Sequence, residues 1–345
     1  MQRRKFIKSA SGLLLAVPLG ISVFDFEKAV FTKDLIVGHN DHRYKVDMTW
    51  GNLDPEKIPV KDCHEMVIDS RGRIVLLTNH TKNNVIIYNK DGEVVKTWGT
   101  EFPGAHGLTL KDEGGEDMLY ITDTERHEVI KTTIDGKIVK IFPYPADFEP
   151  YSEASRYVPT ETAIAENGDI YVADGYGGQY ILHYNAKGEL LNTFGGPGLE
   201  DDKFNNAHGI CIDTRTKEDS LLITARQQNK LKRFTMEGEW LENIDLPGAY
   251  ICRPVVKGEN VYLATIWSGD GASNTGFISV LDKDNQLVSA PGGSTPQYVD
   301  DKLDPVYQTL KLFKHPHDVC VDEDENLYVA QWNAGNVYPF KMTRI

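Results

Sequence analysis

Short segments in which apolar and polar residues alternate recur along most of the chain, bounded by turns that contain Gly, Asn or Asp. A period of two residues is typical of β-strands, because successive side chains point to opposite faces of a sheet. The segments fall into six successive groups, and none keeps the 3.6-residue period of a helix. The first strands of the groups read HEMVID (64–69), HGLTL (106–110), TETAIA (160–165), HGICID (208–213), RPVVK (253–257) and HDVCVD (317–322).

The groups are spaced like the blades of a propeller. Their starting positions are 42, 54, 48, 45 and 64 residues apart, and a four-stranded blade takes about 40–50 residues. The sixth group lacks a fourth strand, which residues 44–50 (YKVDMTW) could supply, closing the ring and removing its open edges. The sequence therefore predicts an all-β fold over residues 31–345, a single six-bladed β-propeller resembling NHL-repeat proteins. The widest interval contains residues 268–314, which we expect to form a lid over one mouth of the channel.

The first 30 residues follow a different pattern. A basic segment, QRRKFIK (2–8), precedes an apolar run from Ser11 to Phe24, which is the order of an export signal. The RR-x-F-x-K arrangement resembles the twin-arginine signal. The twin-arginine export machinery is therefore an expected partner, and the periplasm or the extracellular space is the expected location. The apolar run, of about 14 residues, is short for a membrane span, but no clear cleavage site follows it, so an uncleaved anchor is an alternative.

Composition narrows the classes of partner. The chain has 51 acidic and 37 basic side chains and a formal charge of −14, which argues against nucleic acid, because phosphate binding needs a basic surface. The 30 glycines and 16 tyrosines argue against a coiled coil and a polytopic membrane protein. The four cysteines form no CxxC pair, and we expect no disulfide. We expect a monomer that acts on a small-molecule or peptide substrate.

Histidines are concentrated at the start of the first strands. In a propeller this strand lines the central channel, so equivalent positions converge on the axis. The six positions that we take as equivalent are His64, His106, Thr160, His208, Arg253 and His317. Neutral imidazoles that converge around an open position are what a catalytic zinc requires, and harder divalent ions suit them less well. The alternative is that each histidine has only a structural role.

Five motifs carry a family resemblance. HGLTL at 106, DGYGGQY at 174–180, NAHGICID at 206–213, TAR at 224–226 and HPHDVCVD at 315–322 resemble the lyase domain of peptidylglycine α-amidating enzymes. That domain is a six-bladed NHL propeller that splits a peptidyl-α-hydroxyglycine into a peptide amide and glyoxylate. The resemblance covers residues 44–345 and implies a carbon–nitrogen lyase whose zinc is bound by His106, His208 and His317.

The resemblance also implies a second metal and two catalytic groups. Asp318, with the backbone carbonyls of Leu108 and Met66 or a close neighbour of Met66, would bind a structural calcium. Tyr176 would be the base; a phenol has a pKa of about 10, which a nearby zinc ion and guanidinium could lower. Arg226 would hold the oxygen atoms of the substrate, since a guanidinium is suited to bidentate binding of a carboxylate.

The chain departs from the family pattern at two places. Asn79 and His80 stand where the family has a second functional arginine, and Lys82 is the nearest cation. His315 replaces a methionine two residues before the last zinc ligand. The residues that we expect around the metal without an assigned role are His64, Arg253, Asn79 and His315.

Three classes of function remain open. The first is an exported zinc-dependent lyase or hydrolase acting on a small polar or carboxylated substrate. The second is a non-catalytic NHL propeller that binds a partner at its mouth. The third is a calcium-dependent propeller lactonase or esterase, against which the three histidines count, because calcium prefers oxygen ligands. Metal content distinguishes these classes.

Overall fold

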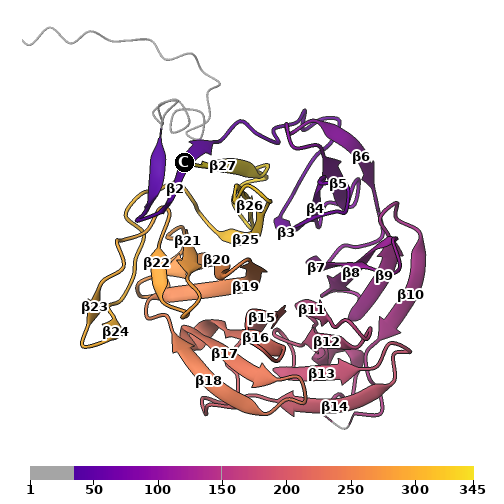
Figure 1. The fold of residues 1–345 in the computed structure, drawn as a ribbon. Coiled ribbons are helices and arrows are strands. Elements are labelled where there is room, and N and C mark those ends of the chain that lie inside the picture. Colours follow the sequence, from indigo (N-terminus) through magenta and orange to yellow (C-terminus); the bar gives the residue numbers. More distant parts are fainter. Residues whose placement is uncertain (1–34, 149) are drawn as a thin grey trace, which may run out of the picture. The chain divides into compact units, whose positions relative to one another are not determined.

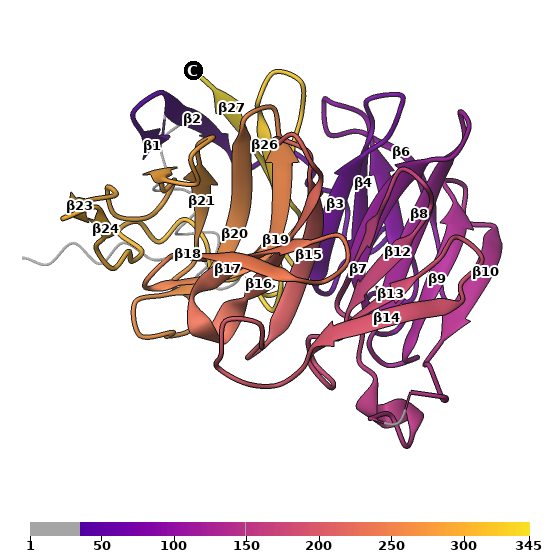
Figure 2. The same ribbon diagram turned by 60° about the horizontal axis from the view of Figure 1, so that its bottom comes forward.

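Six antiparallel sheets surround a central axis in the computed structural model, which describes residues 35–148 and 150–345 (Figure 1). The first strands of successive blades contact one another in ring order, and the last of them contacts the first. Figure 2 shows several of these strands standing side by side around the axis. The predicted six-bladed all-β propeller is therefore confirmed. The proposed signal segment, residues 1–30, lies outside the described residues.

Blades one to five each contain four consecutive strands. Blade one has β3 (Cys63–Ile68), β4 (Ile74–Thr78), β5 (Val85–Tyr88) and β6 (Val94–Trp98). Blade two has β7 (Ala105–Asp112), β8 (Asp117–Asp123), β9 (Glu128–Thr133) and β10 (Ile138–Pro143). Blade three has β11 (Glu161–Ile164), β12 (Ile170–Ala173), β13 (Tyr180–Tyr184) and β14 (Leu190–Gly195). Blade four has β15 (Ala207–Asp213), β16 (Ser220–Ala225), β17 (Lys230–Thr235) and β18 (Trp240–Asp245). Blade five has β19 (Ala249–Lys257), β20 (Asn260–Ser268), β21 (Phe277–Leu281) and β22 (Leu287–Ser289).

Blade six joins the two ends of the described chain. Its strands are β25 (Pro316–Val321), β26 (Leu327–Gln331), β27 (Phe340–Arg344) and β2 (His42–Asp47), with β1 (Ile36–His39) paired to β2 as a fifth strand. The predicted closure is confirmed, since β2 pairs antiparallel with β27. The closing strand begins and ends earlier than the predicted 44–50, and Trp50 instead packs in the following turn, where its Nε1 donates to the Lys90 carbonyl at 3.0 Å.

The segment 268–314 does not form the expected lid. It contributes β21 and β22 to blade five and a small hairpin of β23 (Tyr298–Val299) and β24 (Lys302–Leu303). Figure 1 shows this hairpin outside the ring, beside β22. The prediction was wrong because part of the wide interval is used by ordinary blade strands.

Hydrophobic side chains between neighbouring blades form the core. The cluster between blades four and five, for example, contains fully buried Leu222, Leu231 and Leu263. Helical structure in the described residues is limited to two 3-10 turns, η1 (Ala154–Arg156) and η2 (Arg226–Gln228). This part of the chain has no helix long and apolar enough to span a membrane.

Candidate metal centre

A bulge in the first strands turns side chains towards the axis. Five of the six strands shift register against the second strand of their blade at this level. A bulge leaves residues unpaired and redirects their side chains. In blades two and four the second bulge residue is Gly107 or Gly209, where a Cβ would lie 2.5 Å from backbone atoms of the next blade. Glycine at these positions therefore lets neighbouring blades approach closely beneath the histidines.

Four imidazole rings meet at this level. The ring centroids of His106, His208 and His317 lie 4.8–4.9 Å from one another. His64 lies in the same layer, 4.8 Å from His106 and 4.9 Å from His317. All four side chains are buried. The structure thus brings together the three predicted zinc ligands and places His64 directly beside them.

Hydrogen bonds to backbone carbonyls orient two of the rings. His106 Nδ1 lies 2.8 Å from the Thr160 carbonyl, and His317 Nδ1 lies 3.0 Å from the carbonyl of His64. A carbonyl can only accept, so Nδ1 carries the proton and Nε2 keeps a free lone pair for a metal. Burial lowers the pKa of each of the four histidines, and the neighbouring positive groups lower it further. The imidazoles are therefore neutral at ordinary pH, as metal binding requires.

Blade five contributes a cysteine, Cys252, to this layer. Two sets of potential donors each lie within 4.8 Å of one another: His64, His106 and His317, and His208, Cys252 and His317. Sequence reasoning took Arg253 as the equivalent of the histidines and missed Cys252. The correct match aligns Cys252–Arg253 with His208–Gly209 and His317–Asp318, as the bulge between Ile251 and Pro254 indicates. Burial raises the pKa of the Cys252 thiol, against the lowering effect of Arg226.

Tyr176 reaches this layer from the loop after β12. Its hydroxyl lies 3.2 Å from His106 Nε2 and 3.0 Å from His208 Nε2. The edge of a zinc tetrahedron with bonds of about 2.0 Å is about 3.3 Å, so the hydroxyl lies about as far from these nitrogens as a fourth ligand would. Burial of the hydroxyl raises the pKa of Tyr176, and Arg226 only partly opposes this. Its neighbours within the protein therefore do not produce the lowered pKa that we expected.

Arg226 lies beside Tyr176 and comes from the end of the second strand of blade four. It begins η2 directly after β16, and this 3-10 turn keeps its side chain buried. Its Nη2 donates to Cys252 Sγ at 3.3 Å, and its guanidinium lies 5.8 Å from the centre of the Trp267 ring. Arg226 Nε is buried and has no hydrogen-bond partner within the described residues. This guanidinium edge is available to a ligand.

A cavity of about 590 Å³ opens above the imidazoles. Among the described residues that line it, Arg226 is the only cation, and Glu125 is the only acid. The remaining polar lining is rich in amides, and two tryptophans contribute apolar area: Asn79, Gln179, Asn205, Asn206, Gln227, Trp267 and Trp332. The cavity can therefore bind one anionic group by an ion pair and other polar groups by amides.

The departures from the family pattern have clear structural positions. Asn79 lines the cavity, and its amide is held by two hydrogen bonds of 3.0 Å with Asp62. Lys82 points elsewhere and donates to the Glu56 carbonyl, so no second cation replaces the missing arginine. His315 lies outside the imidazole layer, where Nε2 accepts a hydrogen bond from the Asn274 amide. It supports a loop and does not line the cavity.

The expected calcium site does not fit an ion. Its three ligands all accept hydrogen bonds from Arg253, which donates to the Leu108 carbonyl at 2.8 Å, to that of Met66 at 2.9 Å and to Asp318 Oδ2 at 2.8 Å. Burial and the neighbouring Glu161 raise the pKa of Glu65 well above its usual range. Burial also raises the pKa of Asp318, which Arg253 opposes. The guanidinium is thus the cation of this layer.

Curated proteins with similar sequences include amidating enzymes. Peptidyl-α-hydroxyglycine α-amidating lyase 1 of Drosophila melanogaster is 29% identical over 274 residues, which is 72% of this chain and 47% of the relative. Peptidylglycine α-amidating monooxygenase of Rattus norvegicus is 22% identical over 75% of this chain and 26% of the relative. NHL repeat-containing protein 3 of Homo sapiens is 23% identical over 57% of this chain and 58% of the relative. The chain thus spans between about a quarter and somewhat over half of these proteins.

Solved structures support the fold. A streptogramin B lyase structure superposes with a TM-score of 0.58 and 15% identity, covering 87% of this chain and 97% of the other. At this identity the likeness concerns the fold alone. No family model matches the chain. Together, fold and relatives support a six-bladed propeller of the NHL type.

Proposed function

We propose that this NHL-type propeller is a zinc-dependent lyase that cleaves a carbon–nitrogen bond at a carbon bearing a hydroxyl group, as amidating lyases do. The observation that carries the proposal is the convergence of His106, His208 and His317 below an open cavity, with the Tyr176 hydroxyl 3.2 Å from His106 Nε2 and 3.0 Å from His208 Nε2. Three neutral imidazoles and an open position are the features of catalytic zinc sites. Export by the twin-arginine pathway and a monomeric state belong to the same proposal and rest on the sequence.

The residues present fit zinc, since Nδ1 of His106 and of His317 donates to a backbone carbonyl, which leaves Nε2 to bind a metal, and the donor sets found among the described residues contain imidazoles and a thiol but no acid. When bound by the three histidines, zinc supplies a Lewis acid that polarises a substrate oxygen. Arg226 binds the carboxylate of the substrate through its planar edge. Tyr176 would act as the phenolate, the form that a cation bound beside it favours, and would accept the proton of the substrate hydroxyl as the carbon–oxygen bond becomes a carbonyl. The carbon–nitrogen bond breaks, the amide nitrogen takes back a proton from Tyr176, and an aldehyde and an amide leave.

The lining of the cavity narrows the substrate. A second arginine would bind a second anionic or carbonyl oxygen, but Asn79 at that place offers only neutral amide atoms. We therefore propose a small polar substrate with one carboxylate and expect low activity on peptidyl-α-hydroxyglycine. The two tryptophans and the other amides leave room for a leaving amide that differs from a peptide.

Metal analysis tests the ligands. The isolated protein should contain about one zinc per chain. His208→Ala should remove the zinc while the propeller stays folded, because the strand pairing within each blade does not involve the metal. His315→Ala is the matched control, since this histidine lies outside the layer. Elemental analysis and circular dichroism measure both properties. If the alanine variants of His106, His208 and His317 all kept as much zinc as the wild type, the assignment would be refuted.

Turnover tests the base. Tyr176→Phe should lower the release of glyoxylate or a related aldehyde by ~10²-fold or more, because the ring remains but the proton acceptor is lost. Zinc content and thermal stability should stay unchanged. Tyr307→Phe, at an exposed tyrosine that does not line the cavity, serves as the control. The assay uses a panel of peptide and small-amide α-hydroxyglycine derivatives, and full turnover by Tyr176→Phe on any of them would exclude this mechanism.

A further inference from the structure

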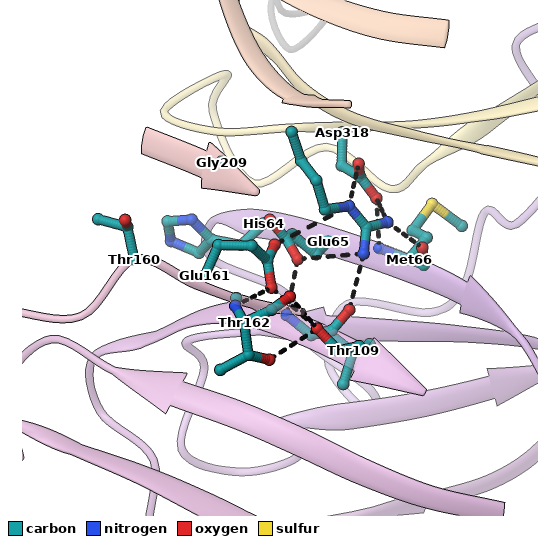
Figure 3. A network of polar contacts seen from close by, with 12 residues as sticks. His64, Glu65, Met66, Thr109, Thr160, Glu161, Thr162, Gly209 and Asp318 are labelled. Atoms are coloured by element: carbon teal, nitrogen blue, oxygen red, sulfur yellow. Dashed lines mark hydrogen bonds and ion pairs between the residues drawn. The ribbon is translucent and has the colours of Figure 1, made fainter. Parts of the chain in front are cut away.

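Beneath the imidazoles lies a second layer of buried charged groups. Each comes one residue later on its strand than the imidazole, threonine or cysteine above it, and the members are Glu65, Glu161, Arg253 and Asp318. Figure 3 shows Glu65, Glu161 and Asp318 directed towards one another, close to Met66. The three carboxyls and one guanidinium come from four different blades. Because buried charges are costly unless they are paired, the single cation determines whether this layer is stable.

The Arg253 guanidinium makes its contacts with three other blades. Nη1 donates to the Leu108 carbonyl of blade two at 2.8 Å, and Nη2 donates to the Met66 carbonyl of blade one at 2.9 Å. Nη2 and Nε also form a bidentate pair with Asp318 of blade six, at 2.8 and 3.1 Å. The planar fork thus matches two carbonyls and one carboxylate at once. Arg253, itself in blade five, links four of the six blades at the axis.

The acceptors are those that a hard cation would use. Two backbone carbonyls and a carboxylate are typical calcium ligands, at distances of 2.3–2.6 Å. A calcium ion within that distance of all three would overlap the guanidinium. We propose that Arg253 takes the place of a calcium ion in this propeller, so that the layer is held together by a covalently attached cation and needs no metal. This proposal does not depend on the lyase activity.

Two further carboxyls, those of Glu65 and Glu161, lie near the guanidinium and would help to bind a calcium ion if the arginine were removed. Glu65 Oε2 lies 3.5 Å from Arg253 Nη1, and Glu161 Oε2 lies 3.9 Å from Nε. Glu65 Oε1 and Glu161 Oε2 are buried, and within the described residues no amide or hydroxyl donates to either atom; besides Arg253, the two carboxyls interact with each other. Without the guanidinium the layer would offer three carboxyls and two carbonyls around one empty place. That donor set is suited to calcium.

Thermal denaturation at varied calcium concentration tests the proposal, with the same free zinc concentration set in every buffer because EGTA also binds zinc. The midpoint of the wild-type chain should be the same in EGTA and in millimolar calcium. Arg253→Ala, produced in the presence of calcium, should melt about 10 °C lower in EGTA, because buried carboxylates lose their cation. Added calcium should recover most of that loss. Arg233→Ala is the matched control, since it removes another buried arginine, from Asp213, without leaving a comparable ring of oxygens.

Each outcome decides the question. A wild-type midpoint that rises with calcium, or calcium retained by the wild type after dialysis, would overturn the proposal. If the Arg253→Ala variant were as stable as the wild type in EGTA, Arg253 would not stabilise the fold by linking the blades. If the Arg253→Ala variant is destabilised and calcium does not restore its stability, the oxygen atoms around the guanidinium do not form a calcium site. Rescue that is abolished in Arg253→Ala combined with Asp318→Ala would support it further.

Discussion

At the scale of single residues, a shift of one position separates two kinds of chemistry. Cys252 and the imidazoles form a layer of nitrogen and sulfur donors, whereas Arg253 and the carboxyls form the charged layer beneath it. Neighbouring residues of an ordinary strand point to opposite faces. At the bulges both residues face the axis. A first strand with such a bulge, as in blades one, five and six, can therefore contribute to the candidate metal centre and to the ion-pair layer with consecutive residues.

Arg226 gives a prediction at this scale. Arg226→Lys should raise KM for a carboxylated substrate by about tenfold or more, because an ammonium lacks the planar fork that binds a carboxylate bidentately. The change in kcat should be smaller, and zinc content should not change. Steady-state kinetics on the carboxylated substrate and on its amide analogue provide the measurement and the control. If both substrates lost the same affinity, Arg226 would not bind the carboxylate.

At the scale of elements, alternation predicted the strands well. The closing strand was predicted because the sixth group lacks a fourth strand, and the pairing of β2 with β27 agrees with that prediction. The short β1 strand was not predicted, because its four residues IVGH are isolated and include a glycine. The equivalence of Cys252 to the histidines was also not predicted. It depends on the bulge in β19, which is a feature of the pairing between two strands and cannot be read from one strand alone. The contacts of Arg253 could not be predicted, since they join strands more than 60 residues apart in sequence.

The C-terminal end of β15, the first strand of blade four, gives a prediction on pH dependence. Asp213 accepts hydrogen bonds of 2.8 Å from both Arg215 and Arg233, and Arg215 also binds the Glu259 and Asp282 carbonyls of blade five. Burial alone would raise the pKa of Asp213, but the hydrogen bonds from the two arginines lower it to about 2. The folded state thus binds this proton less readily than the unfolded chain. Its stabilisation is present above about pH 4 and is lost as the pH falls towards 2.

Asp213→Asn should therefore lower the free energy of unfolding by about 2 kcal/mol at neutral pH. The difference from wild type should shrink as the pH falls below about 4. Urea unfolding at pH 7, 5 and 3 measures it. Asp284→Asn, which removes an exposed ion pair with Lys283, should change stability by less than about 1 kcal/mol. A difference for Asp213→Asn that is constant with pH would show that its charge is not what stabilises the blade.

At the scale of the whole molecule, the two layers divide the channel. The cavity above the imidazoles is lined by His64 and His106, whereas a second cavity of about 540 Å³ begins at Met66 and Arg253 and is lined by the lower ends of the first strands. The charged layer lies between them. A substrate can therefore reach the imidazoles only from the mouth that contains Tyr176 and Arg226. The acidic and thiol groups of the lower cavity take no part in the proposed reaction.

Closure of the ring gives the last prediction. The hairpin of β1 and β2 pairs with β27 of blade six, and its turn is bonded to blade five, where the His39 amide donates to Ser289 Oγ at 2.8 Å. A chain that begins at residue 48 should melt at least about 10 °C below one that begins at residue 31. The shorter chain loses the buried side chains of Tyr44 and Val46, worth about 1.5–3 kcal/mol each, and it exposes the edge of β27 to solvent. Calorimetry of the two chains provides the comparison, and the longer one controls for removal of residues 1–30. Midpoints within about two degrees of each other would mean that the ring is held closed by the contacts of β25 with β3, and that the hairpin only covers an edge.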